Sequence, residues 1–318
     1  MPRYVITGAS GHIGNNLVRI INELEPDSPV IALTRRTVGK ELNGTVCKQV
    51  VGDLGSREFL EENISEGDIV MHLAGIIDLS NTMPEETDRV NHIGTRLICD
   101  VCLKKKVGRF IYFGSVDGVA KSGGTIESPD EYYPKRIEEN YGQSKARAAQ
   151  YVTESIKAHP DFNAAILLPS AVIGINDHKP SAVGKVISDT LAGKAEFGIR
   201  GGYNFVDVRD VCLAALSLCR SDARGSFIIS GHSVSVSELY GAINRARGFR
   251  RKPLLIPLPL VKIFMPFIKV LNPITLKALT EEHNYSYKKA ELVLGYTPRP
   301  FEETLEDTLA WFENEAGK

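Results

Sequence analysis

Three side chains in the middle of the chain have types and spacing that could support proton transfer. Tyr141 and Lys145 stand four positions apart, a spacing that a helix brings onto one face. A phenol with its ordinary pKa of about 10 is a poor acid at neutral pH, and a neighbouring ammonium would stabilise its anion and lower that value. Ser115 lies upstream, at the end of an apolar run, and adds a hydroxyl. A Tyr-x-x-x-Lys pair alone is frequent by chance, but with the serine it predicts general acid–base chemistry.

The segments that must position these side chains alternate between strand-like and helix-like patterns. Five short apolar runs, each of a length suited to a buried strand, are separated by stretches with helical periodicity. This alternation predicts an α/β fold with a doubly wound parallel sheet, whose ligands bind at the carboxyl ends of the strands. Ser115 is therefore predicted to face the ligand cleft. The five runs begin at Tyr4 and continue at 30–34, 46–51, 68–73 and 109–115.

The first strand passes directly into a turn with glycine at every third position. Gly8 would adopt backbone angles that a side chain forbids, Gly11 would let a diphosphate approach the main chain, and Gly14 would let the next helix lie close to its strand. That helix would point its free N–H groups and its positive dipole end at the phosphates. A glycine triplet alone is weak evidence, but here strand, turn and helix follow in the order that a dinucleotide site requires.

The ends of the next strands carry residues suited to the rest of a dinucleotide. Arg35 and Arg36 follow the second strand, where the adenosine ribose is read, and guanidinium groups pair with a 2′-phosphate, whereas a carboxylate would accept from a 2′-hydroxyl. The pair therefore favours NADP over NAD, unless both are only exposed loop residues. Asp53, after the third strand, could accept from the adenine amino group or merely cap a helix. Ala74 and Gly75 follow the fourth strand, and their small size would let the ribose and phosphate of the cofactor pass close to the backbone.

Further features of the chain carry weaker predictions. His72 is interpreted as a strand residue rather than a catalytic one. A helix predicted over 83–105 contains an asparagine, Asn91, and a glycine, both of which disfavour helix, so a packing or polar role is expected. Residues 116–134 are rich in Gly, Ser and Pro, and they form a loop long enough to serve as a functional lid.

The composition excludes several classes of protein. The 318 residues are 43% hydrophobic and 24% charged, with a formal net charge of −1 and no long basic block, which argues against nucleic acid as a partner. Five cysteines in a chain of this length do not make a disulfide framework, and no metal site is predicted. Prolines and lysines interrupt the apolar region 253–273, so it cannot form an unbroken membrane-spanning helix, although an interfacial or substrate-covering helix stays open. Met1-Pro2-Arg3 leads straight into the first strand and leaves no room for a targeting peptide, so the cytoplasm is expected.

Taken together, these features make the chain resemble the extended short-chain dehydrogenase/reductase family. The resemblance covers nearly the whole sequence, and its motifs are jointly specific for the family but not for one substrate. It implies a Rossmann domain over 1–170, with 203–230 returning to it, and a smaller, discontinuous substrate lobe made of 171–202 and 231–318. The matching segments are 7–14, 52–54, 73–75, 90–91, 94–95, Ser115, Tyr141 with Lys145, 168–174, 205–211, 289–290 and 294–298.

The resemblance also implies roles and partners. Tyr141 would be the general acid/base, Lys145 would bind the nicotinamide ribose and tune Tyr141, and Ser115 would hold the substrate oxygen. The stretch 169–172 would contact the nicotinamide end of the cofactor. Since dimers are common in the family, a homodimer is expected besides the small-molecule substrate. The cofactor-binding residues so predicted are Thr7, Gly8, Gly11, His12, Ile13, Gly14, Arg35, Arg36, Asp53, Leu54, Leu73, Ala74, Gly75, Tyr141, Lys145, Pro169, Ser170 and Val172.

Family members with this plan include dihydroflavonol reductases, hydroxysteroid dehydrogenases, aldehyde reductases, and nucleotide-sugar epimerases and dehydratases, and the fold cannot choose among them. The dehydratases carry two acids directly after the Ser/Thr position, where residues 116–118 of this chain are Val-Asp-Gly, which argues against dehydration. Epimerases generally hold NAD and require basic residues for a substrate diphosphate. Arg200, Arg250 and Arg251 could serve in that way, so epimerisation stays open.

The apolar segment 254–271 falls where the family builds its substrate lobe. It resembles the reductases and steroid dehydrogenases more than the sugar enzymes, although a helix packed on the core would give the same pattern. The expected function is therefore an NADP-dependent oxidoreductase that transfers a hydride between nicotinamide and a carbonyl/alcohol of a largely apolar small molecule. Two alternatives stay open, a nucleotide-sugar epimerase of the same family and a non-catalytic NADP-binding sensor. The presence of Ser115, Tyr141 and Lys145 argues against the sensor, which needs no proton donor.

Overall fold

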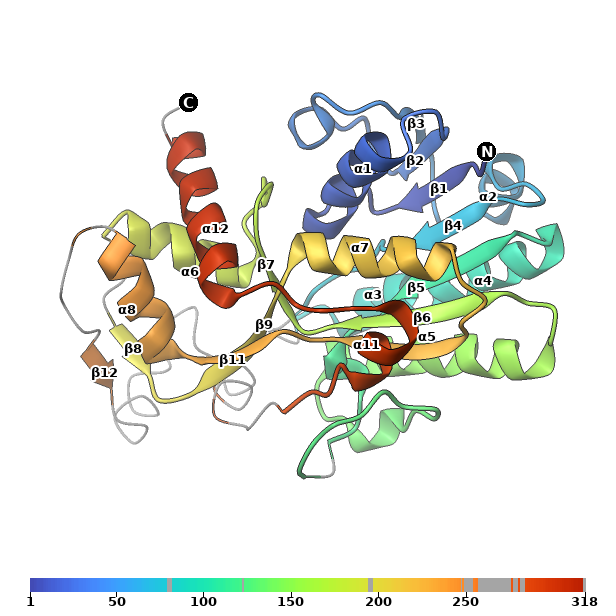
Figure 1. Ribbon diagram of the computed structural model, residues 1–318. Helices are drawn as coiled ribbons and strands as arrows, with labels where there is room; N and C mark the ends of the chain where they lie inside the picture. The colour runs from blue at the N-terminus through green and yellow to red at the C-terminus, as the bar shows by residue number, and fades with distance from the viewer. Residues whose placement is uncertain are drawn as a thin grey trace.

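Seven parallel strands form the central sheet of the computed structural model, in the order β10-β6-β5-β4-β1-β2-β3 (Figure 1). The parallel doubly wound sheet predicted from the sequence is confirmed, and all five predicted strands belong to it. Two more strands, β6 and β10, extend it beyond β5. The strands are β1 (Tyr4–Thr7), β2 (Val30–Thr34), β3 (Lys48–Val51), β4 (Ile69–His72), β5 (Arg109–Phe113), β6 (Ala164–Pro169) and β10 (Gly225–Ile229).

The structure describes residues 1–78, 82–121, 123–193, 197–246, 248, 254–256, 276, 280 and 284–316. Of the apolar segment 254–271, only the short strand β12 (Leu254–Ile256) belongs to this set. Arg250 and Arg251, the two candidates for a substrate diphosphate, lie outside the described residues, and so does the rest of that segment.

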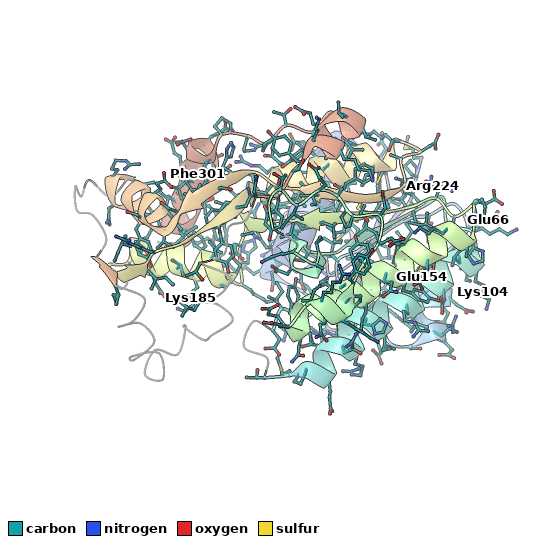
Figure 2. The ribbon with its side chains drawn as sticks, turned by 90° about the horizontal axis from the view of Figure 1, so that it is seen from below. Glu66, Lys104, Glu154, Lys185, Arg224 and Phe301 are labelled. Carbon is teal, nitrogen blue, oxygen red and sulfur yellow. The ribbon has the colours of Figure 1, made fainter. Side chains whose placement is uncertain are left out.

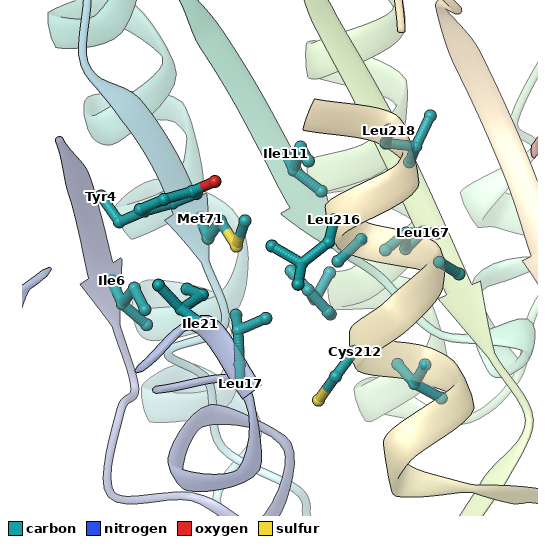
Figure 3. Close-up of a cluster of buried hydrophobic side chains, with 14 of the residues drawn as sticks. Tyr4, Ile6, Leu17, Ile21, Met71, Ile111, Leu167, Cys212, Leu216 and Leu218 are labelled. Atoms are coloured by element: carbon teal, nitrogen blue, oxygen red, sulfur yellow. The ribbon is translucent and has the colours of Figure 1, made fainter. Parts of the chain in front are cut away.

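Two layers of helices cover the two faces of the central sheet. Because side chains alternate along a strand, Ile6 and Met71 face one layer, whereas Val5 and Val70 face the other. Figure 3 shows the apolar cluster that contains Ile6, where this side chain lies with Leu17 of His12–Leu24 and Leu216 of Val208–Cys219. The first layer holds α1 (His12–Leu24), α7 (Val208–Cys219) and α11 (Lys288–Leu294), and the second holds α2 (Arg57–Asn63), α4 (Gly94–Lys105) and α5 (Asn140–Ala158). The polar residues Lys104 and Glu154 of the second layer are exposed on its outer side (Figure 2).

A second, smaller group of elements follows directly from the end of β6. Its sheet has the order β11-β9-β7, with β7 and β9 parallel and β9 and β11 antiparallel, and β8 pairs separately with β12. A third apolar cluster, which includes Ile187 and Phe301, joins this sheet to its helices. Of residues 203–230, β9 belongs to this smaller group, whereas α7 and β10 pack with the central sheet. The elements are β7 (Ala171–Ile173), α6 (Ala182–Leu191), β8 (Phe197–Ile199), β9 (Gly202–Asp207), β11 (His232–Ser235), α8 (Val236–Ala246) and α12 (Phe301–Ala316).

The helix predicted over 83–105 is interrupted by a wider turn. It consists of α3 (Pro84–Asp88), a π-helical segment η2 (Arg89–Ile93) and α4. Asn91 lies within η2, and its side chain bonds to backbone outside the helix, which provides the polar role expected of it. The sequence did not predict the π turn, because its stabilising contacts come from another part of the chain.

The loop at 116–134 is anchored rather than free. It opens with a short helix η3 (Val116–Gly118), and the N–H of Ile126 donates to the carbonyl of Asn284 at 2.8 Å. Two further short helices are η1 (Lys40–Leu42) and η4 (Pro134–Arg136). Within the described part of the chain, no helix combines the length and the apolar character needed to cross a membrane.

Candidate active site

The glycine turn after β1 has the close backbone contacts that its spacing predicts. Gly8 has a φ of +74°, and a Cβ atom there would lie 2.7 Å from the backbone nitrogen of Ala74. A Cβ atom at Gly14 would lie 2.2 Å from the carbonyl oxygen of Gly8. Gly8 therefore lets the β1 turn pass the β4 loop, and Gly14 lets α1 lie against the turn. Gly11 is the N-cap of α1, whose first-turn N–H groups, those of His12 and Ile13 among them, have no acceptor within the helix.

The side chains at the start of α1 contact the segment that follows β7. The Nε2 of His12 lies 3.0 Å from the carbonyl oxygen of Ile175, and since a carbonyl only accepts, Nε2 carries the hydrogen. The amide of Asn16 donates to the same carbonyl, and the amide of Asn15 donates to Asn176 O. Burial lowers the pKa of His12, so its ring stays neutral. These contacts fasten the glycine turn to the smaller group of elements.

The residues predicted to read the adenosine end lie at the carboxyl edge of the sheet. Arg35 and Arg36 are exposed directly after β2, which pairs with β1. Asp53 is exposed after β3, and its carboxylate accepts from the N–H of Gly55 at 2.9 Å. The alternative that Asp53 caps the next helix is wrong, because the Ser56 hydroxyl is the cap of α2.

Ser115, Tyr141 and Lys145 come together between the end of β5 and the first turns of α5. The phenol of Tyr141 lies close to the Ser115 hydroxyl, which stabilises the phenolate. The Ser115 hydroxyl accepts from the N–H of Asp117 at 3.1 Å and donates to the Asp117 carboxylate at 3.2 Å. The ammonium of Lys145 donates to the carbonyl oxygen of Phe113 at 3.0 Å. The structure thus unites a phenol, a hydroxyl and an ammonium at the carboxyl end of β5.

The acidity of these groups differs from the sequence-based expectation. Burial raises the pKa of Tyr141 well above its ordinary value, the Asp117 carboxylate raises it further, and the nearby Ser115 hydroxyl opposes both. Burial also lowers the pKa of Lys145 to about 8. The prediction that Lys145 lowers the pKa of Tyr141 is therefore wrong for this structure: the ammonium is hydrogen-bonded to Phe113, and desolvation of the phenolate dominates.

A buried polar chain lies beneath the site, and sequence reasoning missed it. The Thr95 hydroxyl donates to the Asn91 carbonyl at 2.6 Å, so it accepts from the Nε2–H of His72 at 2.9 Å. The other ring nitrogen of His72 then accepts from the Thr7 hydroxyl at 2.7 Å, and Thr7 accepts from the N–H of Ala74. Burial, aided by the charge of Lys145, lowers the pKa of His72 to about 3. His72 is a strand residue, as predicted. Its neutral ring links Thr7 of β1 to Thr95 of α4, and Thr7 in turn bonds the loop after β4.

Asn91 joins the loop after β4 to helix α5. Its Oδ1 accepts from the N–H of Ile76 at 2.7 Å, and its Nδ2 donates to the Ile76 carbonyl and to the Ser144 hydroxyl. A Cβ atom at Gly75 would lie 2.9 Å from the Asn91 Oδ1 and 3.4 Å from the Lys145 Nζ. Gly75 therefore sits where the loop, the π turn and Lys145 meet. The weak helix propensity of Asn91 was the sequence signal for this junction.

The remaining predicted cofactor residues lie at the junction of β6 and β7 and against the apolar clusters of the two helix layers. Pro169 and Ser170 stand where β6 runs into β7, and the buried Ser170 hydroxyl has no hydrogen-bonding partner among the described residues. Val172, in β7, and Leu73, after β4, pack half-buried against the apolar cluster of the first helix layer, while Leu54 packs against that of the second. Arg200, a candidate for a substrate diphosphate, is exposed between β8 and β9.

The chain is similar to known proteins over almost its whole length. The family model described as "NAD dependent epimerase/dehydratase family" matches residues 4–229. Sterol demethylase protein B of Methylococcus capsulatus is 25% identical, over 97% of each chain. A putative dihydroflavonol 4-reductase of Synechocystis is 28% identical, over 98% of this chain and 94% of the relative. The crystal structure of UDP-glucose 4-epimerase from Thermotoga maritima with UDP-glucose has a TM-score of 0.80 at 19% identity, covering 99% of both chains.

Proposed function

This chain belongs to the NAD-dependent epimerase/dehydratase family, whose members are extended short-chain dehydrogenases and reductases, and it is an NAD(P)-dependent enzyme of that type. From this premise we propose a more specific function for it. It is an NADP-dependent oxidoreductase that transfers a hydride between nicotinamide and a carbonyl/alcohol of a largely apolar small molecule. One observation carries the proposal: Ser115, Tyr141 and Lys145 come together between the carboxyl end of β5 and the first turns of α5.

Each of the three side chains has a role in reduction. When bound, NADPH would supply the hydride for the carbonyl carbon. Tyr141 gives its phenolic proton to the carbonyl oxygen, and its raised pKa means that the proton is present at neutral pH. Ser115 donates a hydrogen bond to the oxygen as negative charge develops there. Lys145, an ammonium held at Phe113, binds the nicotinamide ribose beside the phenol. In the oxidative direction the proton returns to Tyr141.

The residues at the carboxyl edge fit a dinucleotide phosphate. The free N–H groups at the start of α1 suit the diphosphate, and a small Gly11 at the N-cap keeps the approach open. The Ser170 hydroxyl, which has no hydrogen-bonding partner within the described part of the chain, suits a polar group at the nicotinamide end. Arg35 and Arg36, exposed after β2, suit a 2′-phosphate.

Two observations support a largely apolar substrate. The sequence of 254–271 is rich in Leu, Ile, Val and Phe, and apolar walls with few polar groups are usual in such pockets. Two relatives of matching length are named for sterol demethylation and for dihydroflavonol reduction. Epimerisation of a nucleotide sugar is the second candidate, favoured by the likeness of the whole fold to UDP-glucose 4-epimerase and by the exposed Arg200.

A cofactor-oxidation screen tests the proposed function. We expect NADPH to be consumed with aromatic, terpenoid or steroid-like carbonyl compounds, because the site offers one proton donor and one oxygen-holding hydroxyl. Absorbance of NADPH follows the reaction, and product analysis by mass spectrometry identifies the alcohol. Conversion of nucleotide sugars to their epimers, without turnover of those carbonyl compounds, would contradict the proposal and support the epimerase.

The cofactor preference has a separate test in Arg35→Ala. We expect the wild type to bind NADPH more tightly than NADH, since a charge-assisted hydrogen bond to the 2′-phosphate contributes roughly 1.5–3 kcal/mol. The variant should lose roughly 10-fold or more of its NADPH affinity and little of its NADH affinity. Isothermal titration calorimetry measures both. Arg89→Ala, which removes another exposed arginine, is the control and should bind like wild type. Equal affinities for the two cofactors in the wild type would refute the NADP assignment.

A further inference from the structure

We propose that Tyr112 is a positioning residue for Lys145, and that it acts through the face of its ring rather than through its hydroxyl. The ring lies under the ammonium and holds it charged and in place beside Tyr141. This inference rests on the proposed function only in giving Lys145 a task in the reaction. The contact itself is independent of any substrate.

The ammonium of Lys145 has two contacts that favour its charge. Its Nζ lies 5.2 Å from the centroid of the Tyr112 ring and donates to the carbonyl of Phe113 at 3.0 Å. The residue is only 6% exposed, and no salt bridge reaches it within the part of the chain that the structure describes. A charge taken out of water needs compensation, and a ring face within about 6 Å of a cation provides it.

The alternation of strand β5 provides both contacts from neighbouring residues. Tyr112 packs in the cluster on the α4 and α5 side of the sheet, whereas the Phe113 side chain belongs to the opposite cluster. The Phe113 side chain therefore points away from α5, and only its carbonyl bonds to Lys145, while the Tyr112 ring lies on the side of α5. Tyr112 therefore meets the ammonium with its side chain.

The ring is itself held in place. Tyr112 is 1% exposed and stacks on His72, with ring centroids 5.8 Å apart and an interplanar angle of 27°. Thr7 and Thr95 fix the two nitrogens of His72, as described above. Since this imidazole is neutral, it adds no positive charge beside the ammonium.

The hydroxyl of Tyr112 does not explain the contact. It meets no hydrogen-bonding partner of acceptable geometry among the described residues, and burial raises the pKa of this phenol well above its ordinary value. It is therefore no anion that could pair with Lys145. Three uncharged groups lie around the ammonium: the phenol of Tyr141 on α5, the amide of Asn91 on η2 and the neutral ring of His72 on β4. The nearby carboxylate is that of Asp117 on η3, and it raises the pKa of Tyr141.

Nuclear magnetic resonance titration of the intact protein tests the inference without any substrate. With ¹³C-labelled lysine, the signal of Lys145 is assigned by its loss in Lys145→Met and followed with pH. Burial places this pKa at about 8, within reach of the titration. In Tyr112→Leu, which removes the ring, we expect the pKa of Lys145 to fall by about one unit. In Tyr112→Phe, the matched control, it should stay at the wild-type value. An unchanged pKa in Tyr112→Leu, or an equal fall in both variants, would overturn the proposal.

A second variant series keeps the shape of the site, in case Tyr112→Leu does not fold. Phenylalanines with increasing fluorination, introduced at position 112, keep a ring of similar size but withdraw electron density from its face. The pKa of Lys145 should fall stepwise with fluorination, and a flat response would contradict the role of the ring face. If carbonyl turnover is observed, its high-pH limb should shift in the same order. If no carbonyl compound is turned over, the proposed function fails while the titration still decides the role of Tyr112.

Discussion

Tyr141→Phe should fold and bind the cofactor like the wild type, yet reduce its carbonyl substrate at least about 100-fold more slowly, the size typical of lost general acid catalysis. Only a hydroxyl is removed, and the buried ring keeps its place at the start of α5. The variant lacks the phenolic proton that the proposed reaction gives to the carbonyl oxygen. Steady-state kinetics with NADPH measures turnover, and calorimetry measures cofactor affinity.

Tyr151→Phe is the matched control for this experiment. It lies on the same helix, and its hydroxyl bonds to Asp100 away from the site, so turnover should be nearly unchanged.

The pH profile adds a second readout. Because the pKa of Tyr141 is raised, its proton is kept through neutral pH, and wild-type reduction should fall only above about pH 8, where Lys145 loses its charge. Near-normal turnover by Tyr141→Phe would show that the proton comes from another group.

Gly14→Ala should weaken both the fold and the cofactor site. The added Cβ would lie 2.2 Å from the carbonyl oxygen of Gly8 and 2.8 Å from the Cα of Ala9, and both are backbone atoms with little freedom to move. Helix α1 must shift away from the turn, and overpacking of this kind lowers the free energy of unfolding by roughly 1–3 kcal/mol. The same shift moves the N–H groups that would face the diphosphate, so NADPH affinity should fall at least about 10-fold.

Chemical denaturation measures the free energy of unfolding, and the rise in melting temperature with added NADPH reports binding to the folded state. Gly39→Ala is the control, since a Cβ atom at Gly39 meets nothing within 4 Å and its φ is −105°. That variant should unfold and bind like the wild type. A Gly14→Ala protein with both properties unchanged would mean that α1 does not depend on close approach to the turn.

The sequence by itself determined the features that depend on neighbours along the chain. Strands follow from short apolar runs buried on both faces, and the glycine spacing of the first turn follows from backbone angles and close contacts within a few residues. The pairing of Tyr141 with Lys145 follows from the repeat of a helix. All three are local, so a single sequence is enough to predict them. The family, likewise, was identified from short motifs and is confirmed by the family model over residues 4–229.

Only the tertiary structure decided what surrounds those residues. The partner of the Lys145 ammonium is a carbonyl 32 positions away, and Asn91 bonds to Ile76 across a π turn that no local propensity predicts. The expected lowering of the Tyr141 pKa failed for the same reason. Helix spacing places a lysine near the phenol, but burial by the whole fold sets the free-energy cost of ionising the phenol. Spacing along the chain fixes which groups can meet, whereas desolvation and long-range hydrogen bonds fix their charge.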